Sequence, residues 1–366
     1  MADLSNLASI DRQLIDLIQQ RAEMVRRQFI QDGSVELAGL MNAQGRQIDE
    51  LVAAELTTEA ADESTLSSDA VAAWLRHAAA IGLSKLHTER IAYLGPQYSY
   101  SHLAALKFFG DAAPMAAVAT IPAVFDSIVR GDAQSGLVPI ENSTDGRIVD
   151  TLGMFVRVNV KICGEVLLPI HHNLLSRTPR EQIREVHSKP QALSQCRTWL
   201  ANHLPQARLV ECGSTTTAAE LAASTVGVAA VASIEAARQY QLDVIDSSIE
   251  DNPNNVTRFA VLGRSWSPRS GNDKTAILFQ VPHRPGVLAD AMMVFKEAGL
   301  NLTWIESFPL PQTTAEYLFF VEVAGHVTDS AVASTLEKLG KLTLRLEVLG
   351  SYPKATPVSE QAVAGK

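Results

Sequence analysis

The spacing of apolar residues changes abruptly at Arg90, and this change constrains the fold more than any other feature of the chain. Before Arg90, leucine, isoleucine and methionine recur at steps of three or four residues, which is typical of amphipathic helices. The stretches predicted to be helical are 3–28, 34–55 and 68–86. Because no strand is predicted among them, we expect residues 1–88 to form an all-α domain.

After Arg90, short runs rich in valine and isoleucine alternate with helical stretches as far as Arg264. This alternation is typical of an α/β domain, which we assign to residues 90–265. The predicted strands are 91–94, 136–140, 160–166, 185–187, 207–211, 228–232 and 257–262.

A third pattern begins at Lys274, after a stretch of turn-forming residues from Ser265 to Asp273 that we interpret as an interdomain linker. The predicted elements of residues 274–352 are, in order, a strand (275–281), a helix (286–298), two strands (301–307 and 317–323), a helix (330–339) and a strand (343–349). This βαββαβ order is the ferredoxin-like plan. The polar residues 353–366 are predicted to be a flexible tail.

Charge and composition exclude several classes of function. The formal net charge of −9 and the lack of a Lys/Arg cluster argue against nucleic-acid binding. No apolar run approaches the ~20 residues that span a bilayer, and the N-terminus lacks the pattern of a signal peptide. Cys163, Cys196 and Cys212 are too widely spaced for a disulfide framework or a zinc site. We therefore expect a cytoplasmic protein that binds no membrane and no metal.

Polar side chains follow several predicted strands at the point where a helix is expected to begin. The segment Val138–Gly146 ends in such groups, and so do 93–102, 187–196 and 213–219. Helix N-termini present free N–H groups and a positive dipole end, which favour an anion. Each joint taken alone is explained as well by ordinary helix capping. Together they suit a small ligand that carries more than one carboxylate.

The last strand of the α/β domain opens with Asn254-Asn-Val-Thr-Arg-Phe. Alternation along a strand places Thr257 and Phe259 on one face and Arg258 on the other. In the simpler interpretation, Thr257 is an ordinary strand residue and Arg258 a solvated charge at a sheet edge.

Four motifs in register resemble the prephenate dehydratase family. They are Tyr-Leu-Gly-Pro at 93–96, Val-Pro-Ile-Glu-Asn-Ser at 138–143, Ser-Lys-Pro-Gln-Ala-Leu-Ser-Gln-Cys at 188–196 and Thr-Arg-Phe at 257–259. The resemblance covers about 90–264 and implies two α/β lobes similar to a periplasmic binding protein, with the active site in the cleft between them. It implies prephenate as substrate, phenylpyruvate as product, and no metal or organic cofactor.

The resemblance also implies residue roles. Thr257 would donate a proton or a hydrogen bond to the departing hydroxyl, and positioned proton transfer of this kind is worth ~10²–10⁴-fold. Asn142 would orient the substrate, and Glu141 is either a second proton-handling group or a helix cap. The candidate substrate-binding residues are Ser143, Ser188, Gln195, Ser214, Thr215, Arg258 and Phe259. Arg258 is included because its fork matches a carboxylate.

Residues 274–352 resemble an ACT domain of the kind attached to these dehydratases, which implies L-phenylalanine as an effector. Arg284-Pro-Gly-Val-Leu288 stands at the effector loop, where glycine allows a close backbone approach to a carboxylate. The implied effector contacts are Pro285, Gly286, Val287, Leu288, Glu306 and Ser307. Phe308 stands where the family has an arginine, which leaves the strength of phenylalanine feedback open. The alternative for this loop is plain turn chemistry.

The first helix resembles that of the AroQ-type chorismate mutases, with Arg21 at an active-site arginine and Arg46 as a second candidate. The chain departs from this family at Leu4, Asp32 and Leu86, where cationic or amide side chains are expected. Mutase catalysis depends on such donors to stabilise charge in the transition state. We therefore predict a domain without mutase activity, kept for assembly into a homodimer or homotetramer.

Two other functions stay open at this point. Arogenate dehydratase differs only in the substrate side chain, where an amino group replaces the keto oxygen. A non-catalytic sensor of aromatic acids would use the same lobes, although it would have no need of both Thr257 and Arg258.

Overall fold

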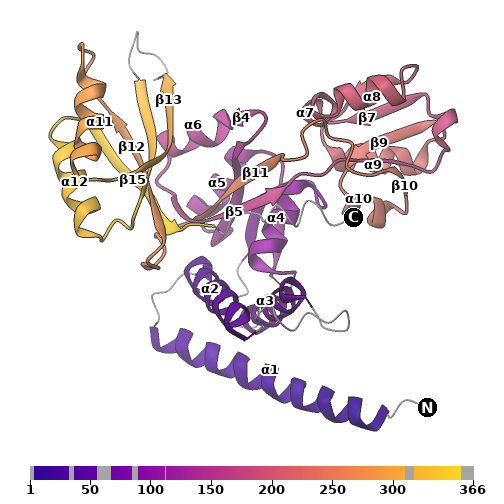
Figure 1. The fold of residues 1–366 in the computed structure, drawn as a ribbon, viewed down its shortest axis with the longest axis horizontal. Helices are drawn as coiled ribbons and strands as arrows, with labels where there is room; N and C mark the ends of the chain where they lie inside the picture. The colour runs from indigo at the N-terminus through magenta and orange to yellow at the C-terminus, as the bar shows by residue number, and fades with distance from the viewer. Residues whose placement is uncertain are drawn as a thin grey trace.

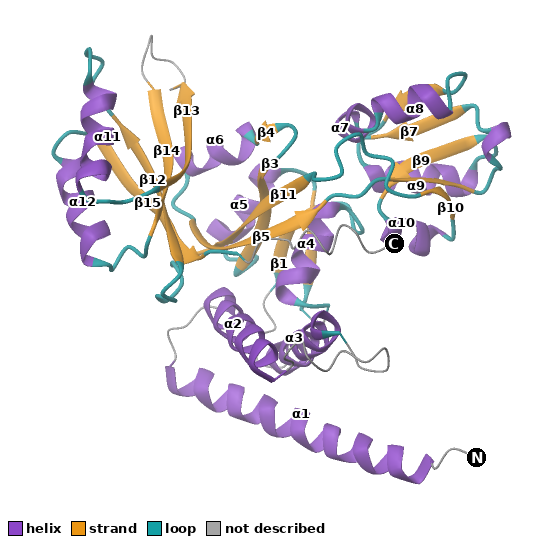
Figure 2. Cartoon of the chain, in the orientation of Figure 1, coloured by secondary structure: helices purple, strands orange, loops and turns teal. Residues whose placement is uncertain are grey.

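A computed structural model describes residues 4–32, 37–55, 67–84, 90–111, 113–309 and 317–355 (Figures 1 and 2). The predictions for Leu86 and for the tail beyond 355 lie outside these residues, and so do those for the side chains of Leu4 and Asp32. Figure 2 shows helices alone at the N-terminal end, and sheets with helices in the rest of the chain. None of the described helices combines the length and the apolar character needed to cross a bilayer.

The N-terminal part consists of α1 (Leu4–Asp32), α2 (Leu37–Glu55) and α3 (Ser68–Ser84), as predicted. Ile48 and Val52 of α2 pack against Ala72 and Ala79 of α3. Helix α2 also lies against the α/β domain, where Asn42 Nδ2 donates to the Cys163 carbonyl at 2.8 Å. Helix α1 lies on the far side of α2 and α3 (Figure 1). Its exposed large apolar side chains are Leu7, Ile10, Leu14, Ile15, Leu17 and Met24.

The α/β domain contains two sheets, which we call its first and second lobes, and the first lobe uses six strands of a ten-stranded sheet. Its strands are β1 (Ile91–Leu94), β2 (Met115–Val118), β3 (Ser135–Asn142), β4 (Gly146–Arg147), β5 (Lys161–Pro169) and β11 (Val256–Gly263). Strands β1, β2 and β3 are parallel, whereas β11 runs antiparallel between β3 and β5. The helices of this lobe are α4 (Tyr100–Phe109), α5 (Ile121–Arg130) and α6 (Val149–Arg157).

The second lobe is a separate five-stranded sheet in the order β10-β6-β9-β7-β8. Its elements are β6 (Asn173–Ser176), η2 (Arg180–Gln182), β7 (Glu185–Ser188), α7 (Pro190–Gln195), α8 (Arg197–His203), β8 (Arg208–Glu211), α9 (Thr215–Ser224), β9 (Val228–Ala232), α10 (Ile234–Tyr240) and β10 (Asp243–Asp246). The chain enters this lobe after Pro169 and returns to β11 after Asp246. Strands β7, β8 and β9 are parallel, so their carboxyl ends lie at one edge of the sheet.

The C-terminal part follows the predicted element order. It consists of β12 (Asp273–Gln280), α11 (Val287–Glu297), β13 (Leu302–Pro309), β14 (Tyr317–Ala324), α12 (Ser330–Gly340) and β15 (Arg345–Pro353). Its strands pair in the antiparallel order β13-β14-β12-β15. At Gly350, β15 meets Ile162 of β5, which joins this sheet to the first lobe. A Cβ at position 350 would overlap the Ile162 carbonyl, so only glycine permits this approach.

Two connecting segments are bonded to the domains beside them. The interdomain stretch 265–273 is fixed in place, because Ser267 is buried and its N–H donates to the Ser351 carbonyl at 3.0 Å. The tail is also anchored at its start, since the backbone N–H of Ala355 donates to Glu165 Oε1 at 2.8 Å. The turn-forming residues therefore predicted where the strands end, but they did not show that the connecting segments are hydrogen-bonded to the neighbouring domains.

Candidate functional site

Thr257 and Asn142 lie opposite each other where β11 begins and β3 ends. Asn142 Nδ2 donates to Thr257 Oγ1 at 2.8 Å and to Asn255 Oδ1 at 2.9 Å. Both Asn142 and Thr257 are buried. Since the amide fills only an acceptor position of Thr257 Oγ1, the hydroxyl hydrogen of Thr257 stays available to a ligand.

The segment after Asn142 forms a turn and not a helix start, which corrects the helix-cap interpretation. Asn142 Oδ1 accepts from the backbone N–H groups of Thr144 and Asp145 at 2.9 and 3.0 Å. Ser143 Oγ accepts from the N–H of Val256 at 2.9 Å and so ties the turn to β11. Helix α6 begins only at Val149. The turn therefore holds the Asn142 side chain in one orientation before Thr257.

Gln195 reaches this group from the second lobe. Its Nε2 donates to Asp145 Oδ2 at 2.7 Å, and its Oε1 accepts from Asn255 Nδ2 at 2.9 Å. Three of the residues predicted from sequence, Asn142, Thr257 and Gln195, thus belong to one hydrogen-bond network across the lobe junction. Asn255 was not predicted as a site residue, although it lies in the same Asn-Asn-Val-Thr run as Thr257.

A second set of residues behind Gln195 was also missed. His172 Nε2 lies 2.8 Å from Gln195 Oε1, and His172 Nδ1 lies 3.0 Å from the Tyr100 hydroxyl. Burial lowers the pKa of His172, which favours a neutral ring. Glu250 accepts from the backbone N–H of His172 at 2.8 Å and binds His171 Nδ1 at 2.8 Å. Because these residues come from both segments that connect the lobes, they hold the junction together.

Other predicted substrate contacts lie in β7, at the start of α9 and in β11. Ser188 is fully buried and donates to the Val231 carbonyl at 2.6 Å. Ser214 caps α9, where its Oγ accepts from the N–H of Thr217 at 2.9 Å, and Thr215 is buried in the first turn of that helix. Phe259 is a core residue of the first lobe. Ser214 fits the expected hydroxyl at a helix start, whereas the Ser188 hydroxyl bonds to a backbone carbonyl and Phe259 packs in the core, and their roles as substrate contacts stay predictions.

The edge of the second sheet that carries these helix starts faces the first lobe. Ser233, the N-cap of α10, donates from its Oγ to the Tyr98 carbonyl of the first lobe at 3.5 Å. Ser99 caps α4 on the opposite side. The N-termini of α4 and α10 therefore both lie at the junction, as expected for a site that receives an anion.

Arg258 lies on the face of β11 opposite Thr257, as alternation predicts, and two of its three nitrogens are paired with carboxylates, while its Nη2 is buried without a hydrogen-bond partner among the described residues. Arg258 Nη1 lies 2.7 Å from both carboxylate oxygens of Glu322, and Arg258 Nε lies 3.1 Å from Glu141 Oε2. Burial acts to lower the pKa of Arg258, but the Glu322 carboxylate outweighs it and holds this pKa above its ordinary value. Because Arg258 and Glu141 lie on the face of the sheet opposite Thr257, this geometry does not favour their predicted contacts with a ligand beside Thr257, and both roles stay predictions.

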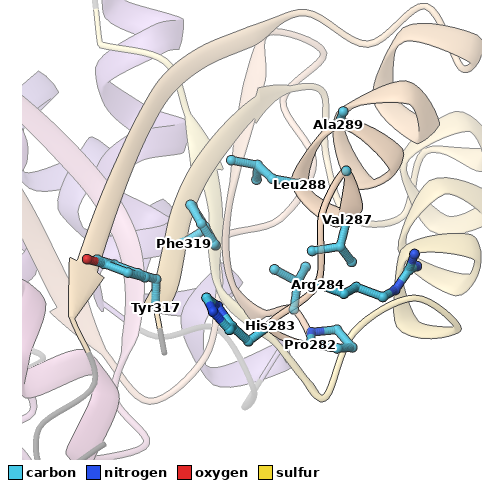
Figure 3. A pocket seen from close by; sticks show the side chains of 10 residues that line it. Pro282, His283, Arg284, Val287, Leu288, Ala289, Tyr317 and Phe319 are labelled. Carbon is cyan, nitrogen blue, oxygen red and sulfur yellow. The ribbon is translucent and has the colours of Figure 1, made fainter. Parts of the chain in front are cut away.

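A cavity of about 200 Å³ lies at the loop that was predicted to bind an effector (Figure 3). It is lined by Val281, Pro282, His283, Arg284, Gly286, Val287, Leu288, Ala289, Tyr317 and Phe319. Gly286 adopts a φ of 80° and precedes the first residue of α11. Of the predicted contacts, Gly286, Val287 and Leu288 line the cavity. Pro285 and Ser307 are not among its lining residues, and Glu306 instead pairs with Arg147 at 2.6 Å.

Two arginines of the helical domain have buried atoms without a partner within the described part of the chain. These atoms are Arg21 Nη1 and Arg46 Nη1, and Gln44 Oε1 is left in the same way. No group of three or more His, Cys, Asp or Glu side chains suited to a metal occurs in the described ranges.

Comparison with known proteins gives two family matches and several close relatives. The prephenate dehydratase model matches residues 91–266 and the ACT domain model matches residues 275–341. The bifunctional chorismate mutase/prephenate dehydratase of Stutzerimonas stutzeri is 36% identical over 357 residues, which cover 95% of each chain.

Two solved structures are also similar. The prephenate dehydratase of Arthrobacter aurescens in complex with L-Phe has a TM-score of 0.68 and 31% identity, and covers 75% of this chain and 96% of that one. GqqA, described as a novel type of quorum quenching acylase, has a TM-score of 0.66 and 28% identity, and covers 73% of this chain and 98% of that one.

Proposed function

The chain belongs to the bifunctional chorismate mutase/prephenate dehydratase family and is a prephenate dehydratase, and we propose that it acts at the junction of its two α/β lobes with Thr257 as the proton donor. The observation that carries this proposal is the hydrogen bond of 2.8 Å from Asn142 Nδ2 to Thr257 Oγ1. It fixes the threonine oxygen and leaves the threonine hydrogen for the substrate.

Formation of the aromatic ring supplies the driving force of the reaction. Prephenate loses carbon dioxide and its ring hydroxyl, the ring becomes aromatic, and the keto acid phenylpyruvate remains. One proton is consumed, because the departing hydroxide leaves as water. Thr257 donates its hydrogen to that oxygen as the C–O bond breaks, and a solvent proton restores the hydroxyl afterwards.

Asn142 makes Thr257 a better donor than an isolated hydroxyl. The amide N–H withdraws electron density from Thr257 Oγ1, and hydrogen bonds in a chain polarise one another. The same amide is held by Asn255 and by the turn at 144–145, so little reorganisation is needed during the reaction. Burial of Asn142 and Thr257 strengthens both effects, since the local dielectric is low.

We propose that the helix N-termini at the lobe junction and the side chains around Gln195 bind the two carboxylates of prephenate. We infer that the lobes resemble a periplasmic binding protein and close over the dianion about the two connecting segments. Gln195 supports this role, because it already bridges from the second lobe to Asp145 and Asn255 of the first. Ser214 and Ser143 stay candidate contacts.

Fold alone does not assign the activity, since a structure of similar TM-score is described as an acylase. The test is to incubate the purified full chain with prephenate and to follow phenylpyruvate by absorbance. We expect turnover without any added metal or cofactor. Comparing kcat/KM for prephenate and arogenate then decides between the two dehydratase substrates. Absence of turnover with both compounds would favour the non-catalytic sensor.

We propose that the C-terminal domain, 274–352, has the ferredoxin-like fold and that it senses phenylalanine. The cavity beside Gly286 supports this, because it joins N–H groups at the start of α11 to the aromatic wall of Tyr317 and Phe319 (Figure 3). L-phenylalanine presents a carboxylate and a ring, which match these two surfaces. Inhibition of phenylpyruvate formation by L-phenylalanine tests the assignment.

For the helical domain we keep the prediction that mutase activity has been lost, while ligand binding has a specific argument in its favour. Arg21 Nη1 and Arg46 Nη1 are buried and lack hydrogen-bond partners in the described chain, and burial lowers the pKa of Arg21. A carboxylate would satisfy such atoms. The exposed apolar side chains of α1 support assembly with a second copy, and a cytoplasmic homodimer or homotetramer completes the proposal. Conversion of chorismate that is abolished by Arg21→Ala would reverse the prediction of lost activity.

A further inference from the structure

The strands that carry Thr257 and Asn142 also carry a second pair of facing residues, on the other side of the sheet. In the register of β11 and β3, Thr257 lies opposite Asn142, and the next pair along is Arg258 opposite Glu141. Arg258 Nε donates to Glu141 Oε2 at 3.1 Å. Whatever fixes the Arg258–Glu141 pair therefore also fixes the neighbouring Thr257–Asn142 pair, because adjacent residues share one backbone.

The backbone ladder between β11 and β3 is interrupted beside these two pairs. The register between β11 and β3 shifts between Arg258 and Phe259, where Phe259 lies opposite Pro139. A shift of this kind leaves an unpaired residue and bends the strand, and proline offers no N–H to the ladder. Thr257 and Asn142 lie beyond this irregularity, at the end of the sheet. On its other side, β11 pairs with β5 without a shift from Val256 to Val261, so the position of β11 is fixed there. The contact that joins Arg258 to Glu141 therefore adds to strand pairing in aligning Thr257 with Asn142 on the β3 side.

Glu322 of β14, in the ACT domain, anchors Arg258. Both of its carboxylate oxygens lie 2.7 Å from Arg258 Nη1, and its side chain is 1% exposed. Glu322 is itself held by Tyr352 of β15, whose hydroxyl donates to Oε1 at 2.7 Å. Trp304 of β13 lies beneath the guanidinium, with the Arg258 Cζ 5.1 Å from the ring centre. Glu322 of β14 and Trp304 of β13 thus contact Arg258 directly, and Tyr352 of β15 holds Glu322 in place.

The remaining charges of this interface complete the cluster. Glu165 of β5 lies 3.3 Å from Arg258 Nη1, and Lys274 of β12 lies 3.0 Å from the same carboxylate. The cluster holds three carboxylates and two cations, so Glu322 compensates Arg258 while Lys274 compensates Glu165. Placing five charged groups at a buried interface costs desolvation energy and adds little net stability. The charged cluster beside the site is better explained by the fixed position that it gives to Arg258.

We propose that Glu322 is a positioning residue for the dehydratase reaction, which acts through Arg258 to hold Thr257 in register with Asn142. The inference rests on the proposed role of Thr257. It makes the ACT domain part of the catalytic unit even when no effector is bound. Loss of the anchor lets the end of β11 shift, and a shift of about 1 Å in a reacting group is enough to cost ~10²-fold in rate.

The test uses the full chain with Glu322→Gln, alone and combined with Thr257→Val. In the Thr257 background, kcat for prephenate is expected to fall by about 10- to 100-fold with KM nearly unchanged. In the Thr257→Val background, Glu322→Gln is expected to cause no further fall, because the group that it positions has gone. A purely structural role would lower activity in both backgrounds.

Two more variants keep the test decisive. Tyr352→Phe removes only the hydroxyl bonded to Glu322 and preserves the packing, so it is expected to lower kcat in the same background-dependent way if Glu322→Gln does not fold. Arg345→Gln is the matched control, since Arg345 Nη2 donates across the same domain interface to the Val156 carbonyl at 3.0 Å, away from β11. It should leave kcat unchanged.

Wild-type kcat in folded Glu322→Gln and Tyr352→Phe, or equal losses in both backgrounds, would overturn the inference while leaving the role of Thr257 intact. Near-normal turnover of Thr257→Val alone would instead refute the proposed function, and the inference with it.

Discussion

The substitution Asn142→Asp gives a sharp test of how the site is polarised, because it replaces an amide donor by an acceptor of the same shape. Asn142 Nδ2 now donates to Thr257 Oγ1 at 2.8 Å and to Asn255 Oδ1 at 2.9 Å. An ionised carboxylate cannot donate to either oxygen. Thr257 would turn its own hydrogen toward the carboxylate and so lose it for the substrate.

The magnitude follows from two separate losses. If Thr257 cannot donate its proton to the departing oxygen, the reaction should slow by ~10²–10⁴-fold, which corresponds to about 3–5 kcal/mol in the barrier. Stability should fall less, by about 1–3 kcal/mol, because a carboxylate then faces Asn255 Oδ1 without a donor. Activity is therefore expected to drop far more than folding.

The pH dependence provides the decisive assay. Burial raises the pKa of a carboxyl group, and Asn142 is 7% exposed. Below that pKa the introduced group is protonated and can donate one hydrogen bond, so kcat of the variant should rise as the pH falls. Asn254→Asp is the control, since it adds the same charge at an exposed position of the neighbouring segment. A folded Asn142→Asp enzyme with wild-type kcat near neutral pH would refute the reasoning.

Three further predictions concern the other parts of the chain. Gly350→Ala should lower the free energy of unfolding by about 1–3 kcal/mol, seen as a lower Tm, because a Cβ overlaps the Ile162 carbonyl; Gly45→Ala, in a helix with open space, should not destabilise. Gly286→Ala should raise the concentration of L-phenylalanine needed for inhibition, because its φ of 80° costs other residues about 1–2 kcal/mol; an unchanged inhibition curve would contradict this. Purified protein should not convert chorismate, and a mutase assay on wild type and Arg21→Ala checks this directly.

Much of the fold was predictable from local patterns. The strands at 91–94 and 228–232 and the whole βαββαβ order were found because their apolar runs are bounded by turn residues. Strands β2, β4, β6 and β10 were missed. Strand β2 is Met-Ala-Ala-Val, which has little strand preference, and β10 is a short edge strand that begins and ends with an aspartate.

The residues of the candidate site were likewise predictable where local patterns place them, and not where they depend on contacts between distant parts of the sequence. Alternation correctly placed Thr257 and Arg258 on opposite faces of β11, and the motif around Asn142 marked the end of β3. The network that connects them joins residues far apart in sequence, such as Tyr100 with His172. Likewise, the partner of Arg258 is Glu322 in another domain. No local pattern shows that a distant carboxylate already pairs with an arginine that is otherwise suited to a ligand.

The most direct measurement is kcat for prephenate in the wild-type chain, in Thr257→Ser and in Thr257→Val, each confirmed as folded. The account predicts that the serine variant, which keeps a hydroxyl for Asn142 to polarise, retains most of the activity, while the valine variant loses at least ~10²-fold. Equal rates for the valine and wild-type enzymes would show that the hydroxyl at this position takes no part in expelling the departing oxygen.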